Sequence, residues 1–113
     1  MSTFKFSDLP VTAIRAGAER RIAYTDRLML VIFDFNDGPK IQPDPPHQHL
    51  HEQVSYVAEG EILFFQGDEP PIHLVPGDGY TVLPNVPRCI QLITPHVRLV
   101  DAFTPLREDF LSK

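Results

Sequence analysis

Proline is spaced so densely along this chain that long helices are excluded. The 113 residues include twelve prolines and six glycines, and a proline inside a helix removes a backbone hydrogen bond and clashes with the preceding turn. The segments between these breakers are short and rich in β-branched, aromatic and leucine side chains, which is typical of strands. The sequence therefore predicts an all-β protein, a sandwich or barrel of many short strands.

Nine strands are predicted, with glycine, proline, asparagine and aspartate marking the turns between them. We expect them at residues 11–16, 20–24, 28–35, 53–58, 61–66, 72–75, 80–83, 89–94 and 97–103. Apolar and polar residues alternate on both sides of Glu59-Gly60, which predicts a β-hairpin over 54–64. A short helical turn is expected over 106–111, after Pro105.

Length and composition indicate one globular domain, residues 1–113, around one modest core. The net charge is −5 and no basic stripe stands out, so nucleic acid is not an expected partner. The longest apolar run, 28–33, is too short to span a membrane, and residues 1–10 lack the apolar stretch of a signal peptide. A single cysteine forms no internal disulfide, and together these features predict a cytoplasmic protein.

Three of the five histidines lie in Pro46-His47-Gln48-His49-Leu50-His51-Glu52-Gln53. His47 and His49, two residues apart on an extended chain, point to the same face. Neutral imidazoles suit a divalent transition metal such as zinc, nickel, iron or manganese, and Gln53 can add its amide oxygen. The alternative is that these are solvated loop histidines, as an isolated His-x-His usually is; the strands that surround the segment favour a site.

The spacing of His47, His49, Gln53 and Gly60 resembles the first conserved motif of the cupins, and residues 76–87 resemble their second motif. This resemblance covers nearly the whole chain. It implies a cupin double-stranded β-helix, a jelly-roll barrel with an internal pocket. Cupins host many chemistries, so the fold alone does not give a function.

The chain departs from the cupin pattern at Arg88, where the resemblance implies a further metal-binding histidine, and in a longer segment 38–47. A guanidinium has no free lone pair, so Arg88 is not a metal ligand, and its charge would repel a metal beside it. The implied ligands on the protein are then reduced to His47, His49 and Gln53, with His51 as a possible substitute.

Strand 97–103 places Leu99, Asp101 and Phe103 on one face by alternation. If that face points inward, desolvation raises the pKa of Asp101 toward the range useful for proton transfer. The alternative is that Asp101 only caps the strand or pairs with Arg107.

The pattern Asp101-x-Phe103-x-x-x-Arg107 is similar to the ending of the KdgF-type cupins of pectin and alginate breakdown, and residues 20–30 and 51–57 are similar to them as well. The resemblance implies conversion of a 4,5-unsaturated monouronate, an acidic sugar, into its linear keto form. It implies catalytic or substrate-contacting roles for Asp101, Phe103 and Arg107.

Arg88 leaves two hypotheses open: it neutralises Asp101 and leaves a dead site, or it takes over carboxylate binding from the metal. The leading hypothesis is the KdgF-like enzyme. The alternatives are a non-catalytic cupin that binds a small acidic ligand without metal, and a metal-dependent oxygenase.

Other residues receive simpler interpretations. Tyr56, Phe64 and Tyr80 are expected to line the barrel or its core, and Tyr56 is also a candidate ligand contact. Cys89 follows Arg88, whose charge would lower the thiol pKa, but no histidine is placed as its base, so a buried structural cysteine is expected. Exposed apolar surface on the first strands would fit a homodimer.

Overall fold

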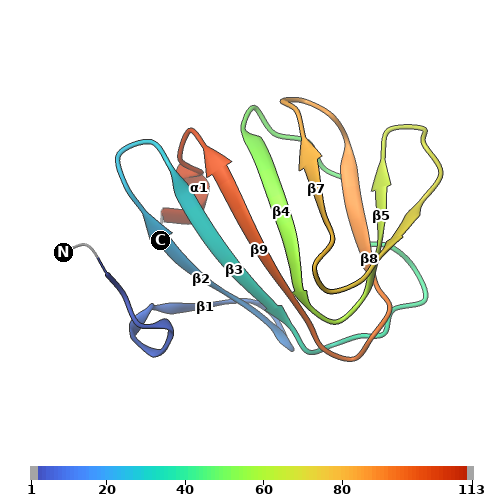
Figure 1. Cartoon of the computed structure of the whole chain (residues 1–113), viewed down its shortest axis with the longest axis horizontal. Coiled ribbons are helices and arrows are strands. Elements are labelled where there is room, and N and C mark those ends of the chain that lie inside the picture. Colours follow the sequence, from blue (N-terminus) through green and yellow to red (C-terminus); the bar gives the residue numbers. More distant parts are fainter. Residues whose placement is uncertain (1–2, 112–113) are drawn as a thin grey trace.

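Nine strands in two antiparallel sheets make up most of the computed structural model, which describes residues 3–111 (Figure 1). The larger sheet has the order β1-β2-β3-β9-β4-β7 and the smaller one β6-β5-β8. The strands are β1 (Val11–Arg15), β2 (Ala18–Tyr24), β3 (Met29–Phe35), β4 (Glu52–Glu59), β5 (Ile62–Gln66), β6 (Ile72–Leu74), β7 (Gly79–Val82), β8 (Arg88–Leu92) and β9 (Val97–Thr104). The all-β prediction is confirmed, and each predicted strand end lies within two residues of the observed one.

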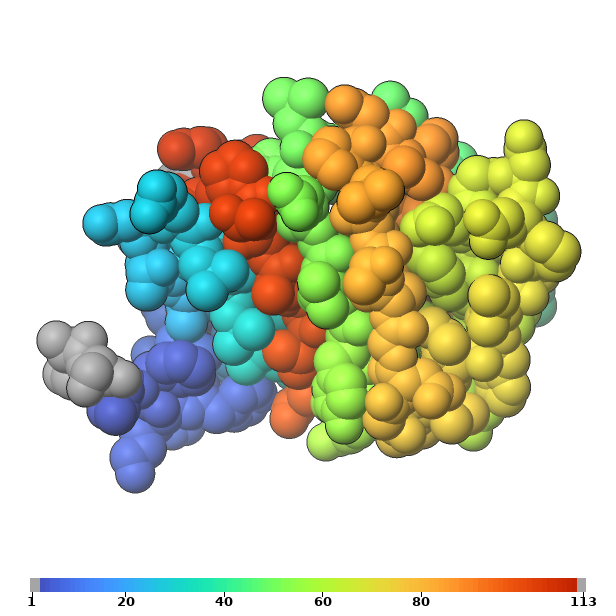
Figure 2. Space-filling model, turned by 45° about the horizontal axis from the view of Figure 1, so that its top comes forward, coloured from blue at the N-terminus to red at the C-terminus, as the bar shows by residue number. Residues whose placement is uncertain are grey.

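Strand β9 is central to the larger sheet, because it pairs with β3 on one side and with β4 on the other. Figure 2 shows its red-orange surface between that of β3 and that of β4. Its side chains alternate between buried and partly exposed along seven residues, as the sequence predicts. The face that carries Leu99, Asp101 and Phe103 therefore points inward, toward the smaller sheet and the C-terminal segment.

The hydrophobic core lies between the two sheets. Val57 and Leu99 from the larger sheet pack with Ile62, Phe64 and Leu92 from the smaller one. A second cluster lies at one end, where Met29, Val31 and Phe103 contact residues after β9. The two clusters leave room between them for polar side chains from β4, β8 and β9.

The predicted hairpin over 54–64 is wrong. Strand β4 already pairs with β9 and β7 on its two edges, so β5 joins the smaller sheet instead. Gly60 carries the chain from one sheet to the other with φ of 78°, a conformation that favours glycine. A side chain there would also collide with the backbone of His96. The alternation on both sides of this turn reflects burial against the same core rather than pairing.

The proline-rich loop after β3 runs along the free edge of β8. Backbone amides of Lys40, Asp44 and His47 donate to carbonyls of Leu92, Ile90 and Arg88, at 2.9, 2.8 and 3.1 Å. This ladder ends in an isolated antiparallel bridge between His47 and Arg88. The loop thus delivers the histidine segment to the first residue of β8.

Two short helical segments complete the described chain. A 3₁₀ turn, η1 (Phe6–Asp8), precedes β1, and the helix α1 (Glu108–Leu111) follows β9 within the predicted range 106–111. Within residues 3–111, no helix has the length and apolar character needed to cross a membrane.

Candidate functional site

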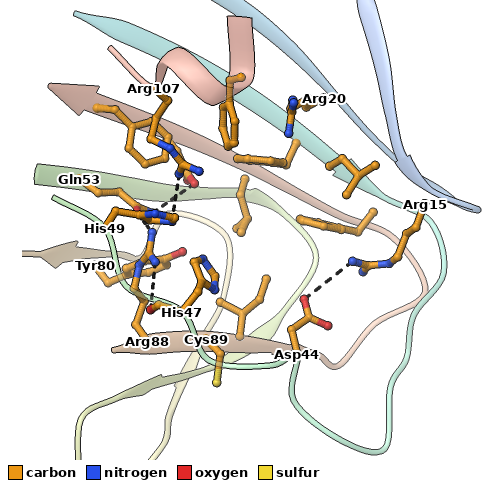
Figure 3. A pocket seen from close by; sticks show the side chains of 18 residues that line it. Arg15, Arg20, Asp44, His47, His49, Gln53, Tyr80, Arg88, Cys89 and Arg107 are labelled. Carbon is orange, nitrogen blue, oxygen red and sulfur yellow. Dashed lines mark hydrogen bonds and ion pairs between the residues drawn. The ribbon is translucent and has the colours of Figure 1, made fainter. Parts of the chain in front are cut away.

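A cavity of about 320 Å³ opens between the two sheets, beside the histidine loop and α1 (Figure 3). Seven of the eight residues that the sequence singles out lie on its wall, within the described chain: His47, His49, Gln53, Arg88, Asp101, Phe103 and Arg107. They come from the loop, from β4, β8 and β9, and from the segment before α1. The fold thus brings together the two motifs and the C-terminal pattern, which are far apart in sequence.

Tyr56 is the exception, and its prediction as a lining residue and ligand contact is wrong. Alternation along β4 turns Gln53, Ser55 and Val57 inward, so Tyr56 points to the outer face and is 51% exposed. Tyr80 of β7 lies opposite Ser55 in the sheet and lines the cavity instead, stacked on Phe64 with ring centroids 3.9 Å apart.

Asp101 lies at the centre of the larger sheet, opposite Val31 on β3 and Ser55 on β4. Its side chain lines the cavity and the residue is only 5% exposed. Oδ2 accepts a hydrogen bond of 3.2 Å from Nε2 of Gln53, and within the described chain Oδ1 has no hydrogen-bond partner. Burial raises the pKa of Asp101 to about 7, although hydrogen bonding to Ser55 and the charges of Arg88 and Arg107 oppose the shift. The predicted direction of the shift is confirmed.

Arg107 pairs with Asp109, and this excludes the simpler interpretation in which it pairs with Asp101. Nε and Nη2 of Arg107 donate to the two carboxylate oxygens of Asp109 at 3.0 and 2.7 Å. Nη1 lies 3.0 Å from Nε2 of His49. The guanidinium carbon stands 4.0 Å from the ring centroid of Phe110 and 5.4 Å from that of Phe103. Arg107 is thereby fixed at the cavity wall from three sides.

Arg88 begins β8 and is 6% exposed. Its Nη2 donates a short hydrogen bond to Oε1 of Gln53, and its Nη1 donates to the backbone carbonyl of His47 at 3.2 Å. Nε2 of the same glutamine donates to Ser55 Oγ at 2.7 Å and to Asp101. The Gln53 amide therefore lies between the guanidinium of Arg88 and the carboxyl group of Asp101.

His47 and His49 both line the cavity, with ring centroids 5.0 Å apart. Burial lowers the pKa of both imidazoles, and the positive charges of Arg88 and Arg107 lower it further, for His49 to about 4. Both rings are therefore neutral at physiological pH.

His51 points elsewhere. Its Nε2 lies 3.0 Å from the carbonyl oxygen of Leu106, outside the cavity wall. It is not placed to complete a ligand set with His47 and His49.

The donor atoms do not fit a resident divalent metal. The amide oxygen of Gln53 is bonded to Arg88, and the Nε2 lone pair of His49 accepts from Arg107. Among residues 3–111, no three histidine, cysteine, aspartate or glutamate side chains are grouped to hold a metal ion. Two guanidinium groups would also face such an ion at short range. The oxygenase hypothesis needs bound iron and finds no support in this donor set, and no step below is assigned to a metal.

Guanidinium groups outnumber carboxyl groups on the cavity wall. Within the described chain, the wall carries four arginines against two aspartates: Arg15, Arg20, Arg88 and Arg107 against Asp44 and Asp101. Figure 3 shows Arg88 and Arg107 grouped with Gln53 and the histidines, while Arg15 and Asp44 lie at the opposite end. Such a wall favours an anionic ligand.

Several residues in or beside the cavity wall received no role from the sequence. Ser55 accepts a hydrogen bond from Gln53 and follows it by two residues on β4, so alternation could have identified it. Arg20 of β2 stacks on Phe110 of α1, with 3.9 Å from guanidinium carbon to ring centroid; no local pattern links these distant segments. Cys89 is buried as predicted, but burial raises the pKa of its thiol, so the expected lowering by Arg88 is wrong.

Sequence and structure comparisons with known proteins point to the same family. No protein-family model matches the chain. The pectin degradation protein KdgF of Dickeya dadantii (strain 3937) is 32% identical to it over 106 residues, which is 92% of this chain and 93% of that protein.

Solved structures agree over almost the full length. An RmlC-like cupin from Shewanella frigidimarina NCIMB 400 superposes with a TM-score of 0.85 at 32% identity, covering 97% of this chain and 96% of that one. KdgF from Halomonas sp. gives a TM-score of 0.85 at 28% identity, covering 96% and 99%. The two facing sheets are thus the cupin double-stranded β-helix.

Proposed function

Because the chain belongs to the KdgF-type cupins, we propose that it converts a 4,5-unsaturated monouronate into its linear keto form, as part of pectin or alginate breakdown. The observation that carries this proposal is Asp101, a buried carboxyl group whose pKa is raised to about 7 inside an arginine-lined cavity. A group that titrates near neutral pH can both accept and donate a proton in one catalytic cycle.

The cavity provides the contacts that an acidic sugar needs. Arg88 and Arg107 supply guanidinium groups that match a carboxylate, and Phe103 offers an apolar surface to the sugar ring. Because both imidazoles are neutral, His47 can accept a hydrogen bond from a hydroxyl group or donate one to it, depending on the tautomer. His49 can only donate, through Nδ1, because its Nε2 accepts from Arg107. The cavity therefore combines charge, apolar surface and hydrogen-bonding groups around one carboxyl group.

The chemistry is an isomerisation with no net proton transfer. In the unsaturated uronate the ring oxygen is bonded to an alkene carbon, so opening of the hemiacetal leaves an aldehyde and an enolate. Ionised Asp101 takes the proton of the anomeric hydroxyl as the ring carbon–oxygen bond breaks. The same carboxyl group then delivers that proton to the far carbon of the enolate, which gives the ketone. Oδ1 of Asp101, which is buried and has no hydrogen-bond partner among residues 3–111, is the atom assigned to these transfers.

The test is an assay of turnover with an unsaturated monouronate. The reaction is monitored through the loss of the ultraviolet absorbance of the conjugated double bond, and the product is identified by NMR. Asp101→Asn should reduce the rate above the spontaneous background by about a hundredfold or more. Arg27→Gln, at an exposed position outside the cavity, is the control for handling and folding. Full activity of the Asp101→Asn variant would remove Asp101 from the mechanism.

The alternative, a non-catalytic binder of a small acid, is favoured by one contact. The Gln53 amide joins Arg88 to Asp101, and a cation so close can hold the carboxylate ionised and idle. Under this alternative the protein binds uronates but does not accelerate their ring opening.

We also propose that a second copy of the chain covers the outer face of the larger sheet. Two cross-strand rows of mostly apolar side chains lie there: Leu30, Ala102 and Val54, then Ile32, Val100 and Tyr56. Val54 and Tyr56 are 58% and 51% exposed, and such exposed rows are typical of contact surfaces. Sedimentation of the wild type and of Tyr56→Asp tests this, since the charge should shift a dimer to a monomer.

A further inference from the structure

Arg88 is a buried cation without an ion pair. Within the described chain, no carboxylate lies within salt-bridge distance of its guanidinium, although the residue is only 6% exposed. Its hydrogen-bond partners are a backbone carbonyl and an amide oxygen, both of them neutral. A buried charge without a counter-charge is costly, and the cost falls when an anion enters.

The guanidinium is also held in place. The carbonyl of His47 fixes one terminal nitrogen and the amide of Gln53 fixes the other, so two of its five N–H groups are used. His47 is itself tied to Arg88 by two backbone hydrogen bonds, of 3.0 and 3.1 Å. A rigid guanidinium that loses little freedom on binding is a good carboxylate receptor.

The other three guanidinium groups on the cavity wall of the described chain differ from Arg88. Arg107 is neutralised by Asp109, and Arg15 by Asp37 at 2.7 Å. Arg20 stacks on Phe110 and lies near the opposite wall. Arg88 therefore combines burial and fixed geometry with the lack of a direct ion pair, and the Gln53 amide links it to the carboxyl group of Asp101.

We propose that Arg88 binds the carboxylate of the ligand directly and that the site works without a metal ion. The guanidinium lies between the histidine loop and Gln53, where it binds Oε1 of Gln53, one of the atoms that a metal would need. This inference depends on the proposed function in one respect only, the identification of the ligand as a monouronate.

Gln53 acts as a positioning residue in this arrangement. Its amide oxygen accepts a hydrogen bond from Arg88, and its amide nitrogen donates one to Asp101. It thereby joins the proposed carboxylate-binding group to the carboxyl group of Asp101.

The experiment measures binding of galacturonate, a saturated monouronate that cannot react, by isothermal titration calorimetry. Wild-type protein is treated with chelator, dialysed, and shown by elemental analysis to be metal-free. We expect the same dissociation constant before and after this treatment. Arg88→Gln should weaken binding by at least about tenfold, because a charge-assisted hydrogen bond is lost. Arg88→Lys, which keeps the charge, should bind with intermediate affinity, and Arg27→Gln should match the wild type.

Three results would overturn the proposal: no galacturonate binding by the metal-free wild type, binding that returns only with an added divalent metal, or wild-type affinity in a folded Arg88→Gln variant. Melting temperatures of all variants establish that they are folded. If Arg88→Gln does not fold, wild-type affinity of Arg88→His in the absence of metal counts against the proposal in the same way. Arg88-dependent binding without turnover of the unsaturated sugar would defeat the proposed function alone. Turnover that requires metal would defeat the present proposal alone.

Discussion

Arg107 donates a hydrogen bond through Nη1 to Nε2 of His49, across 3.0 Å. A guanidinium has no acceptor atom, so Nε2 must be the unprotonated nitrogen of the imidazole and Nδ1 must carry the hydrogen. The pKa of His49, lowered to about 4 by burial first and by Arg107 second, agrees with this neutral form. The two side chains thus form one unit at the cavity wall, and Asp109 holds its cationic end.

Replacement of Arg107 by lysine should show whether substrate binding needs only the positive charge or also the shape of the guanidinium group. Lysine keeps the positive charge but loses the fork that binds Asp109 and the planar contact with Phe110. We expect Arg107→Lys to lower kcat/KM by about ten- to a hundredfold, mainly through KM. Steady-state kinetics with the unsaturated uronate provide the measurement, with Arg27→Lys as the matched surface change. An unaltered KM would show that Arg107 does not contact the substrate.

The rate should depend on the ionisation of Asp101. The proposed first step needs the carboxylate, and its pKa in the folded protein is about 7. We expect kcat/KM to rise about tenfold per pH unit below this value and to level off above it. A profile measured between pH 5 and pH 9 checks this. A profile that falls as pH rises through 7 would mean that the protonated form starts the reaction.

The same carboxyl group should reduce stability at alkaline pH. Its folded-state pKa is raised above the ordinary 3.8, so the folded state binds the proton more tightly than the unfolded state. This contribution to stability is fully present below about pH 3.8 and is lost as pH rises through 7. The Asp101→Asn side chain does not ionise, so the variant does not lose this contribution. The difference between its melting temperature and that of the wild type should therefore shift in favour of the variant by about 4 °C or more from pH 5 to pH 8. Thermal melts at both pH values test the sign, with Arg27→Gln, at an exposed position outside the cavity, as the control.

Metal content should respond to Arg88. Wild-type protein purified without an affinity tag should contain far less than one equivalent of transition metal, because Arg88 binds Gln53 and repels cations. Arg88→His removes the charge and adds an imidazole beside His47 and His49, so the metal content should rise toward one equivalent. Elemental analysis after incubation with zinc or nickel provides the readout. Arg88→Gln is the control, because it removes the charge without adding an imidazole.

Much of the fold could be predicted from local pattern. The turn residues and the two-residue alternation located all nine strands of the described chain and the inward face of β9. They did not predict which strands pair. The alternation around Gly60 suggested a hairpin, but the edges of β4 were taken by strands remote in sequence. Pairing between distant strands leaves no trace in a local pattern.

In the candidate site, too, local patterns predict some features, while others depend on contacts between distant segments. The inward position of Asp101 and its raised pKa followed from alternation and burial. The pairing of Arg107 with Asp109 rather than Asp101 depends on where α1 begins, and the bond from Arg88 to Gln53 depends on how the two sheets face each other. Alternation along β4 from the inward Gln53 turns Tyr56 outward, so the local pattern already argues against Tyr56 as a ligand contact. The roles of His47, His49 and Gln53 as metal ligands stay a prediction, and the hydrogen bonds that Gln53 and His49 make to arginines oppose it.

Strand β9 presents the carboxyl group of Asp101 on one surface and the apolar rows of the outer face on the other, from a single run of eight residues. Insertion or loss of one residue at its start would exchange the two surfaces, sending Asp101 into solvent and Ala102 into the cavity. Loops at the cavity mouth can lengthen by any number of residues without this penalty. Variation among proteins of this kind should therefore accumulate in loop length, while the reading frame of β9 relative to its two neighbours stays fixed.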